Sequence, residues 1–160
     1  MTNIKTWLLI VAVALIAIKP VHAKSKPSER KKTLQEYVNT HCKKSCINAK
    51  ELRDTVKTMS RRHSVPSNLI LAIVKVESRF KRTALSKGNY GLMQVNYSTH
   101  RTRNLMDTTT NLEVGTSILS DCLEKTKANL RRTLACYKGD DSPIYRNEIN
   151  KAMLVLASLN

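Results

Sequence analysis

The sequence predicts a mainly α-helical fold formed by a single domain. Apolar residues recur at intervals of three and four from Thr33 onward, first over residues 34–41 and then over residues 52–59, a spacing that puts side chains on one face of a helix. No stretch of useful length alternates between apolar and polar residues, as a half-buried strand would. The 160-residue chain has 137 residues after position 23, which is the size of one ordinary domain. We therefore expect six or seven helices around one core.

The first 23 residues have the pattern of a secretory signal peptide. Lys5 precedes an apolar run over residues 7–18, and Pro20 and a small-residue site at positions 21–23 follow it. This run is shorter than the about 20 residues that a transmembrane helix needs, so we expect cleavage after Ala23 and no membrane span thereafter. An uncleaved anchor is the alternative. Both interpretations predict a periplasmic or secreted protein.

The rest of the chain is expected to be a flexible basic leader over residues 24–32 and a folded domain over residues 33–160. The most hydrophobic helix should be capped by Ser64, contain Pro66 in its first turn and end near Ser78. A glycine-containing break and a short buried stretch at residues 92–95 follow. Three further helices are expected: one capped by Thr110 or Asn111, one from about Lys127 to Tyr137, and one over residues 148–159.

All four cysteines follow the predicted cleavage site: Cys42, Cys46, Cys122 and Cys136. An even number in an exported protein predicts two disulfides, for which three pairings exist. We favour local pairing, because Cys42 and Cys46 are one helical turn apart and a Cys122–Cys136 bridge would be worth about 3 kcal/mol on the chain-entropy model. A zinc site with His41 is the alternative, but the paired spacing of structural zinc sites is missing.

Basic residues dominate the charge, with 28 Lys and Arg against 12 Asp and Glu and a formal charge of +16. Loss of Lys5 and Lys19 with the signal peptide would leave +14. Such a charge is typical of nucleic-acid-binding proteins, but an exported protein meets little nucleic acid, and the basic residues are spread along the chain. We expect peptidoglycan, with its free peptide carboxylates, as the anionic partner. A solubilising surface without a particular partner is the alternative.

Glu77 lies near the C-terminal end of the apolar helix and shares one face with Ile70 and Val74. Desolvation and the negative end of the helix dipole would both raise the pKa of its carboxyl group. A general acid needs such a raised pKa to keep its proton near neutral pH. The alternative is a surface glutamate that pairs with Arg79 or Lys81.

Four short segments are more specific: Glu-Ser-Arg-Phe at 77–80, Ala-Leu-Ser at 84–86, Gly-Leu-Met-Gln-Val-Asn at 91–96 and Ala-Cys-Tyr-Lys-Gly at 135–139. In their order and gaps they resemble the motifs of the lytic transglycosylase family with the goose-type lysozyme-like fold. The resemblance covers roughly residues 64–145 and implies a lysozyme-like helical domain that cleaves peptidoglycan. Two departures stand out. One residue fewer separates Ser86 from Gly91, and the family's Tyr-Asn-Ala-Gly is here Tyr137-Lys138-Gly139.

Carried over residue by residue, the resemblance makes Glu77 the catalytic acid and base. The residues that it assigns to the substrate are Ser86, Gly91, Met93, Gln94, Asn96 and Tyr137. Ser86 would be a polar neighbour of Glu77, Gly91 would allow close backbone approach, and Tyr137 would hydrogen-bond near Glu77. Met93 would line the sugar groove, although a core-filling role is an equally good interpretation of a methionine.

The spacing of acidic residues adds an independent argument. Ordinary glycosidases place a second Asp or Glu across the bond, but the next acidic residue after Glu77 is Asp107. The resemblance then implies that Glu77 acts alone, assisted by the N-acetyl group of N-acetylmuramic acid (MurNAc). The sugar's own 6-hydroxyl would close the ring as a 1,6-anhydro product. No metal or organic cofactor is implied.

Two alternatives remain open at this stage. A lysozyme-like hydrolase would need a distant carboxylate, such as Asp107, Glu113 or Asp121, folded back into the cleft. A non-catalytic peptidoglycan-binding assembly protein would have no need of an acid at Glu77. We expect an enzyme that opens the wall locally for a machine such as a secretion or conjugation apparatus.

Overall fold

The computed structural model describes residues 32–101 and 103–159. The predicted signal peptide lies outside these residues, as do positions 24–31 of the predicted leader. Within the described part, the helices are α1 (Leu34–His41), α2 (Ala49–His63), α3 (Ser67–Ser78), the 3₁₀ helix η1 (Tyr97–Thr99), α4 (Thr108–Lys125), α5 (Leu130–Lys138) and α6 (Pro143–Ala157). Three short strands are β1 (Leu85–Ser86), β2 (Asn89–Tyr90) and β3 (Val95–Asn96). The mainly α-helical fold class predicted from the sequence is confirmed.

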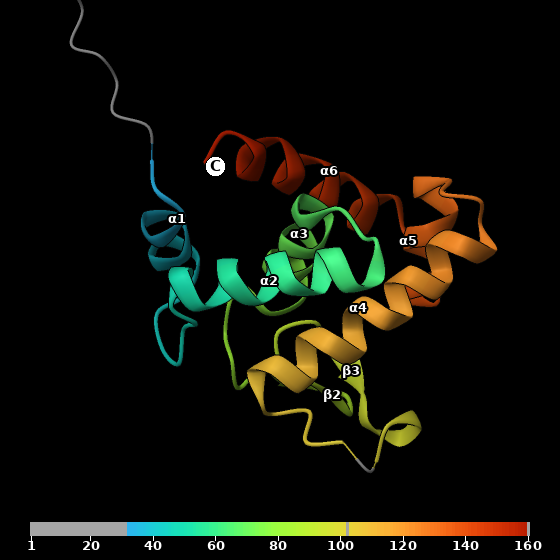
Figure 1. Cartoon of the computed structure of the whole chain (residues 1–160), viewed down its shortest axis with the longest axis horizontal. Helices are drawn as coiled ribbons and strands as arrows, with labels where there is room; N and C mark the ends of the chain where they lie inside the picture. The colour runs from blue at the N-terminus through green and yellow to red at the C-terminus, as the bar shows by residue number, and fades with distance from the viewer. Residues whose placement is uncertain (1–31, 102, 160) are drawn as a thin grey trace, which may run out of the picture. The chain divides into compact units, whose positions relative to one another are not determined.

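Helix α3 lies at the centre of the core. Every residue from Leu69 to Val74 is buried, which is typical of a helix covered on all sides. It packs chiefly against α6 and also against α2, while α4 packs against α2 and α5. Figure 1 shows α2 in front of α3, α6 along its upper side, and the small sheet beside α4. None of the described helices is long and apolar enough to cross a bilayer.

Two helix caps differ from the sequence-based predictions. Ser64 does not cap α3, because it ends α2 in the left-handed conformation with φ 55°; Pro66 is the N-cap residue of α3. Asp107 caps α4, accepting a hydrogen bond from the Thr110 backbone N–H at 2.8 Å, so neither Thr110 nor Asn111 is the cap. Several adjacent side chains can cap a helix, and tertiary packing selects among them.

The last two helices also begin elsewhere than predicted. Helix α5 starts after the cap Asn129, and Lys127 lies outside it with φ 52°. Helix α6 starts at Pro143 after the cap Ser142, a full turn before the predicted start at Glu148. Its earlier start places Tyr145 on the helix, where the ring is buried against the core.

The three strands form an antiparallel sheet that the sequence did not predict. Ser86 pairs with Asn89 across the β1–β2 hairpin, and Tyr90 pairs with Val95 between β2 and β3. Each strand has two residues, which is too short for an alternating pattern to be recognised. The predicted buried stretch at residues 92–95 forms the turn into β3.

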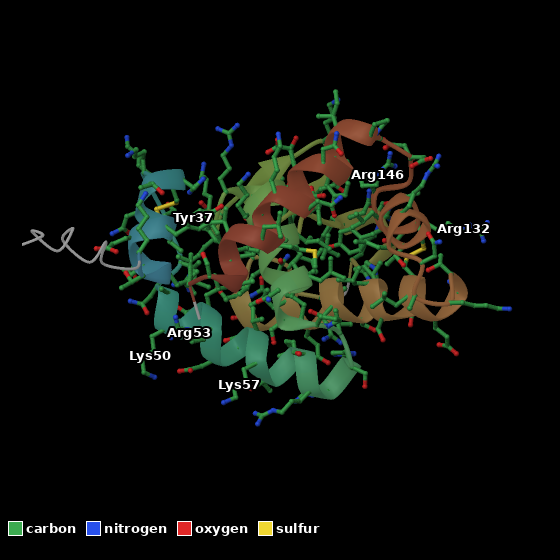
Figure 2. The ribbon with its side chains drawn as sticks, turned by 90° about the horizontal axis from the view of Figure 1, so that it is seen from above. Tyr37, Lys50, Arg53, Lys57, Arg132 and Arg146 are labelled. Carbon is green, nitrogen blue, oxygen red and sulfur yellow. A yellow bond between two sulfur atoms is a disulfide. The ribbon has the colours of Figure 1, made fainter. Side chains whose placement is uncertain are left out.

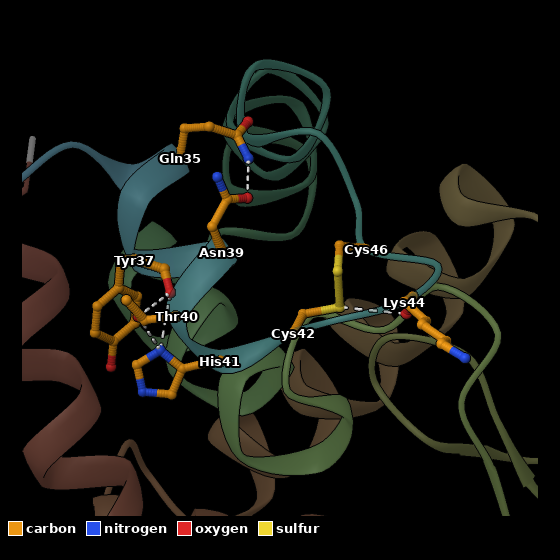
Figure 3. The surroundings of a disulfide bond; sticks show 8 residues. All are labelled: Gln35, Tyr37, Asn39, Thr40, His41, Cys42, Lys44 and Cys46. Atoms are coloured by element: carbon orange, nitrogen blue, oxygen red, sulfur yellow. Dashed lines mark hydrogen bonds between the residues drawn. A yellow bond between two sulfur atoms is a disulfide. The ribbon is translucent and has the colours of Figure 1, made fainter.

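Both disulfides follow the local pairing favoured from the sequence: Cys42–Cys46 and Cys122–Cys136. Because each of the four cysteines is in one of these two disulfides, none is available as a zinc ligand. The zinc-site alternative is therefore wrong. Figure 3 shows the first bridge closing the turn after α1. The His41 ring lies away from the bridge, with its Nδ1 2.8 Å from the Tyr37 carbonyl oxygen.

Replacing Cys122 and Cys136 together by serine should lower the free energy of unfolding by about 2 to 5 kcal/mol, the usual loss for a native disulfide in a small exported domain. Denaturant unfolding of the oxidised protein measures the loss. The matched control replaces Cys42 and Cys46, which close a much shorter loop and should cost less. Equal losses in the two double variants would contradict the loop-length explanation.

Candidate active site

Helix α3 brings Glu77 to the edge of the apolar core. Ile70, Ile73 and Val74, on the same face, are fully buried, and 9% of the Glu77 side chain is exposed. Burial raises the pKa of the Glu77 carboxyl group above its ordinary value, because the ionised form loses its hydration. Tyr145 and Lys138 lower the pKa in part. The predicted direction of the shift is therefore found, with desolvation as its main cause.

Glu77 lines a cavity of about 430 Å³. Its walls come from α3, the small sheet, the segment before α4, and helices α4 and α5. The residues that line it are Glu77, Asn89, Gln94, Val95, Asn96, Thr99, His100, Ile118, Cys136, Tyr137, Lys138 and Gly139. A concave site with converging polar side chains and a perturbed carboxyl group is a candidate active site.

Two tyrosines flank the acid. Tyr137 on α5 donates a hydrogen bond to the Met93 carbonyl oxygen at 2.9 Å, which ties α5 to the turn before β3. Burial and the charge of Glu77 raise the pKa of Tyr137 well above its ordinary value. Tyr145 on α6 is buried, and its hydroxyl makes no hydrogen bond of ordinary geometry with the described residues. Because Tyr145 lowers the pKa of Glu77, the two side chains are close neighbours.

The turn before β3 is held by Asn111, a residue of α4 that is 1% exposed. Its Oδ1 accepts from the Met93 N–H at 2.8 Å, and its Nδ2 donates to the carbonyl oxygens of Tyr90 and Leu105 at 2.8 and 3.0 Å. Gly91 lies against this amide, because a Cβ atom there would be 2.4 Å from Asn111 Nδ2. The close approach at Gly91 is thus to the protein's own backbone and side chains.

The structure brings together four of the residues predicted from the sequence: Glu77, Gln94, Asn96 and Tyr137 all line the cavity. Gln94 has φ 49°, and its Nε2 donates to the Gly91 carbonyl oxygen at 3.0 Å. Asn96 accepts from the Ser98 N–H at 2.8 Å and so caps η1. Their roles toward a substrate stay predictions.

Three other predicted residues lie outside the lining of this cavity. Ser86 is exposed on β1, and its strand partner Asn89 lines the cavity instead. Gly91 is buried at the turn. Met93 is fully buried, and its side chain lies so close to Gly115 that a Cβ there would be 2.7 Å from Met93 Sδ. The Met93 side chain fills the core, which is one of the two interpretations considered from the sequence. Its backbone carbonyl oxygen accepts the hydrogen bond from the Tyr137 hydroxyl.

Two of the three acidic residues considered for a hydrolase have structural partners. Asp107 caps α4. Glu113 pairs with Arg62 at 2.5 Å and lies 3.0 Å from His63 Nε2. Asp121 lines a neighbouring cavity together with Glu113. Among the described residues, Glu77 is the single Asp or Glu that lines its cavity.

Residues 54–153, well over half of the chain, match the transglycosylase SLT domain family. The chain belongs to this family. SLT domain proteins are lytic transglycosylases, which are lyases that act on peptidoglycan, so the cavity around Glu77 lies in an enzyme of the cell wall. None of the solved structures compared with the chain is significantly similar to it.

Sequence reasoning did not predict that Asn89, His100 and Lys138 line the candidate site, or that Tyr145 lies close enough to Glu77 to affect its pKa. Lys138 was visible as a departure from the family motif, but nothing in the sequence showed that it faces Glu77. Tyr145 was hidden because the predicted start of the last helix was too late. The scarcity of aromatic residues in the chain was the one feature of the sequence that could have drawn attention to Tyr145.

Gly91→Ala should lower the free energy of unfolding by more than about 1 kcal/mol, because an alanine with φ near 74° is strained and its methyl group would collide with Asn111. Thermal and denaturant unfolding measure the loss. Gly88→Ala is the matched control, since Gly88 has φ 80° but nothing within 4 Å of the added carbon. If the two variants lose the same stability, strain alone explains Gly91.

Proposed function

We propose that this SLT enzyme cleaves the β-1,4 bond between MurNAc and N-acetylglucosamine and leaves a 1,6-anhydro ring on MurNAc. The observation that carries the proposal is the placement of Glu77. It is a nearly dehydrated carboxyl group with a raised pKa, and it is the single acidic side chain among the described residues that line the cavity. We propose that this one carboxyl group serves as both acid and base.

In the first step Glu77 gives its proton to the glycosidic oxygen. The bond between that oxygen and C1 of MurNAc breaks, and its electron pair stays on the oxygen of the leaving sugar. Positive charge develops at C1, where the carbonyl oxygen of the sugar's own N-acetyl group stabilises it. A second carboxylate is not required, unlike in ordinary retaining glycosidases.

In the second step the Glu77 carboxylate takes the proton of the MurNAc 6-hydroxyl, and the oxygen attacks C1. The new C1–O6 bond closes the anhydro ring and returns Glu77 to its protonated form, so no water is consumed. Because the nucleophile belongs to the same sugar, the attack is intramolecular and loses little entropy. Tyr145 supports the intermediate stage, since it favours the ionised form of Glu77.

The sugar groove is proposed to run along the polar wall of the cavity. Side-chain amides and hydroxyls line this wall: Asn89, Gln94, Asn96 and Thr99. Such groups match the hydroxyl and acetamido groups of the glycan. The Tyr137–Met93 and Asn111–Met93 hydrogen bonds hold the wall in place, which favours a groove that exists before substrate binds.

The charge of the protein supports an anionic partner. Figure 2 shows Lys50 and Lys57 on the outer face of α2 and Arg132 on α5, all directed away from the core. These side chains are exposed, so they can attract peptide carboxylates of the wall at a distance of about one Debye length. We propose that they concentrate the enzyme on peptidoglycan without specifying the bond to be cut.

We also propose that the protein works in the periplasm and opens the wall locally for a cell-envelope machine, such as a secretion or conjugation apparatus. Two disulfides within the described residues support an oxidising compartment. The signal pattern of residues 1–23 supports export.

The purified protein should release 1,6-anhydromuropeptides from isolated sacculi, because none of the other described residues that line the Glu77 cavity is an Asp or Glu that could direct a water molecule. Mass spectrometry of the soluble products tests this, since hydrolysis adds one water that the anhydro product lacks. Products with ordinary reducing ends, which contain the added water, would instead identify the protein as a hydrolase. Binding to sacculi without any soluble product would make it a non-catalytic wall-binding protein.

Glu77→Gln should reduce the rate of release by at least roughly two orders of magnitude, the lower end of what one acid–base group contributes. The far-ultraviolet circular dichroism should stay unchanged. Asp121→Asn is the matched control, because Asp121 lines the neighbouring cavity and should keep near wild-type activity. Loss of activity in Asp121→Asn with activity kept in Glu77→Gln would show that the acid has been misassigned.

A further inference from the structure

Lys138 faces the proposed catalytic acid. Its Nζ lies 3.7 Å from Glu77 Oε2, and 40% of its side chain is exposed. Among the described residues that line the cavity, it is the one Lys or Arg. The family motif that this segment resembles has an asparagine after the tyrosine, where this chain has Lys138.

The Lys138 ammonium group contacts two neighbouring side chains, Glu77 and Tyr145. It lies 5.2 Å from the centre of the Tyr145 ring, a distance at which a cation is attracted by the face of an aromatic ring. The carboxylate of Glu77 and the ring of Tyr145 thus hold one cation between α3 and α6. The Cys122–Cys136 bridge joins α5 to α4 two residues before Lys138, which restrains the helix that carries it.

The titratable groups that face Glu77 come from three elements. Lys138 and Tyr137 lie on α5, Tyr145 lies on α6, and His100 lines the same cavity from the segment before α4. Burial raises the pKa of Glu77, while Tyr145 and the charge of Lys138 lower it. Lys138 is therefore the charged group that opposes the effect of desolvation on the pKa of Glu77.

We propose that Lys138 is a positioning residue of the reaction, whose ammonium group orients the Glu77 carboxyl and stabilises the carboxylate formed when Glu77 protonates the glycosidic oxygen. This inference rests on the proposed function of Glu77. It assigns to Lys138 an effect on proton transfer that acts through Glu77 and requires no contact with the sugar.

The sign of the effect on activity follows from the two states of Glu77. The reaction starts from the protonated acid, so the rate falls as pH rises through the pKa of Glu77. Lys138 lowers that pKa and so brings the alkaline fall in rate to lower pH. In the protonated range, Lys138 makes the proton easier to transfer, because it stabilises the anion that remains.

The first experiment compares pH–rate profiles for muropeptide release from sacculi. Lys138→Met should reduce the rate at low pH by about two- to fivefold, the range for a half-exposed ion pair, and should move the alkaline fall to higher pH. Lys138→Arg keeps the charge and should restore both features toward wild type. Arg132→Met is the matched control: it removes one charge from the exposed face of α5 (Figure 2) and should leave the profile unchanged.

A profile for Lys138→Met that is only scaled down, with no movement along the pH axis, would reduce Lys138 to a structural residue and overturn the proposal. An equal movement in Arg132→Met would attribute the effect to net charge and would overturn it as well. Circular dichroism and thermal unfolding of each variant identify losses of rate that come from misfolding.

The second experiment needs no activity. Carbon-13 NMR titration of the Glu77 carboxyl group should give a higher pKa in Lys138→Met than in wild type or Arg132→Met. An unchanged pKa overturns the proposal. If sacculi are not cleaved at any pH, the proposed function fails, and the titration still decides whether Lys138 stabilises the Glu77 carboxylate.

Discussion

The carboxyl group of Glu77 sits at the end of a helix that the core surrounds, with 9% of its side chain exposed. Loss of hydration disfavours its ionised form, and the pKa rises for that reason. Burial keeps the proton on the Glu77 carboxyl group, and the same burial opposes the release of that proton. Tyr145 and Lys138 lower the pKa of Glu77 and so offset part of this effect of burial.

The wall opposite Glu77 depends on a turn with unusual backbone geometry. Gln94 has a φ of 49°, a backbone strain that persists only where surrounding contacts enforce it, whereas Gly91 adopts its φ of 74° without a steric penalty. Asn111 supplies three hydrogen bonds to this region, and Tyr137 supplies one to the Met93 carbonyl oxygen. The buried amide of Asn111 on α4 and the partly buried phenol of Tyr137 on α5 therefore hold this part of the cavity lining in place.

Two acidic residues outside this cavity, Asp107 and Glu113, have structural partners. Asp107 completes the N-terminus of α4, and Glu113 is engaged by Arg62 and His63. In a chain with 28 basic and 12 acidic residues, most carboxylates find a cation or a helix end nearby. Glu77 differs because its cation, Lys138, lies at 3.7 Å on the solvent side of a desolvated site, where attraction and burial compete.

The sequence by itself determined the helical fold class and favoured the local disulfides, because periodicity and short loops are properties of neighbouring residues. For Glu77, helix position left a surface ion pair as an equal alternative, and the motif resemblance made it the candidate acid. The motif resemblance placed Gln94, Asn96 and Tyr137, and all three line the cavity. Only the tertiary structure decided that Met93 and Gly91 face the interior, that Asn111 is a buried brace, and that Lys138 and Tyr145 meet at Glu77. Those contacts join residues far apart in the chain or depend on where a helix begins. Spacing along one helix cannot predict which side chains another helix will bring to it.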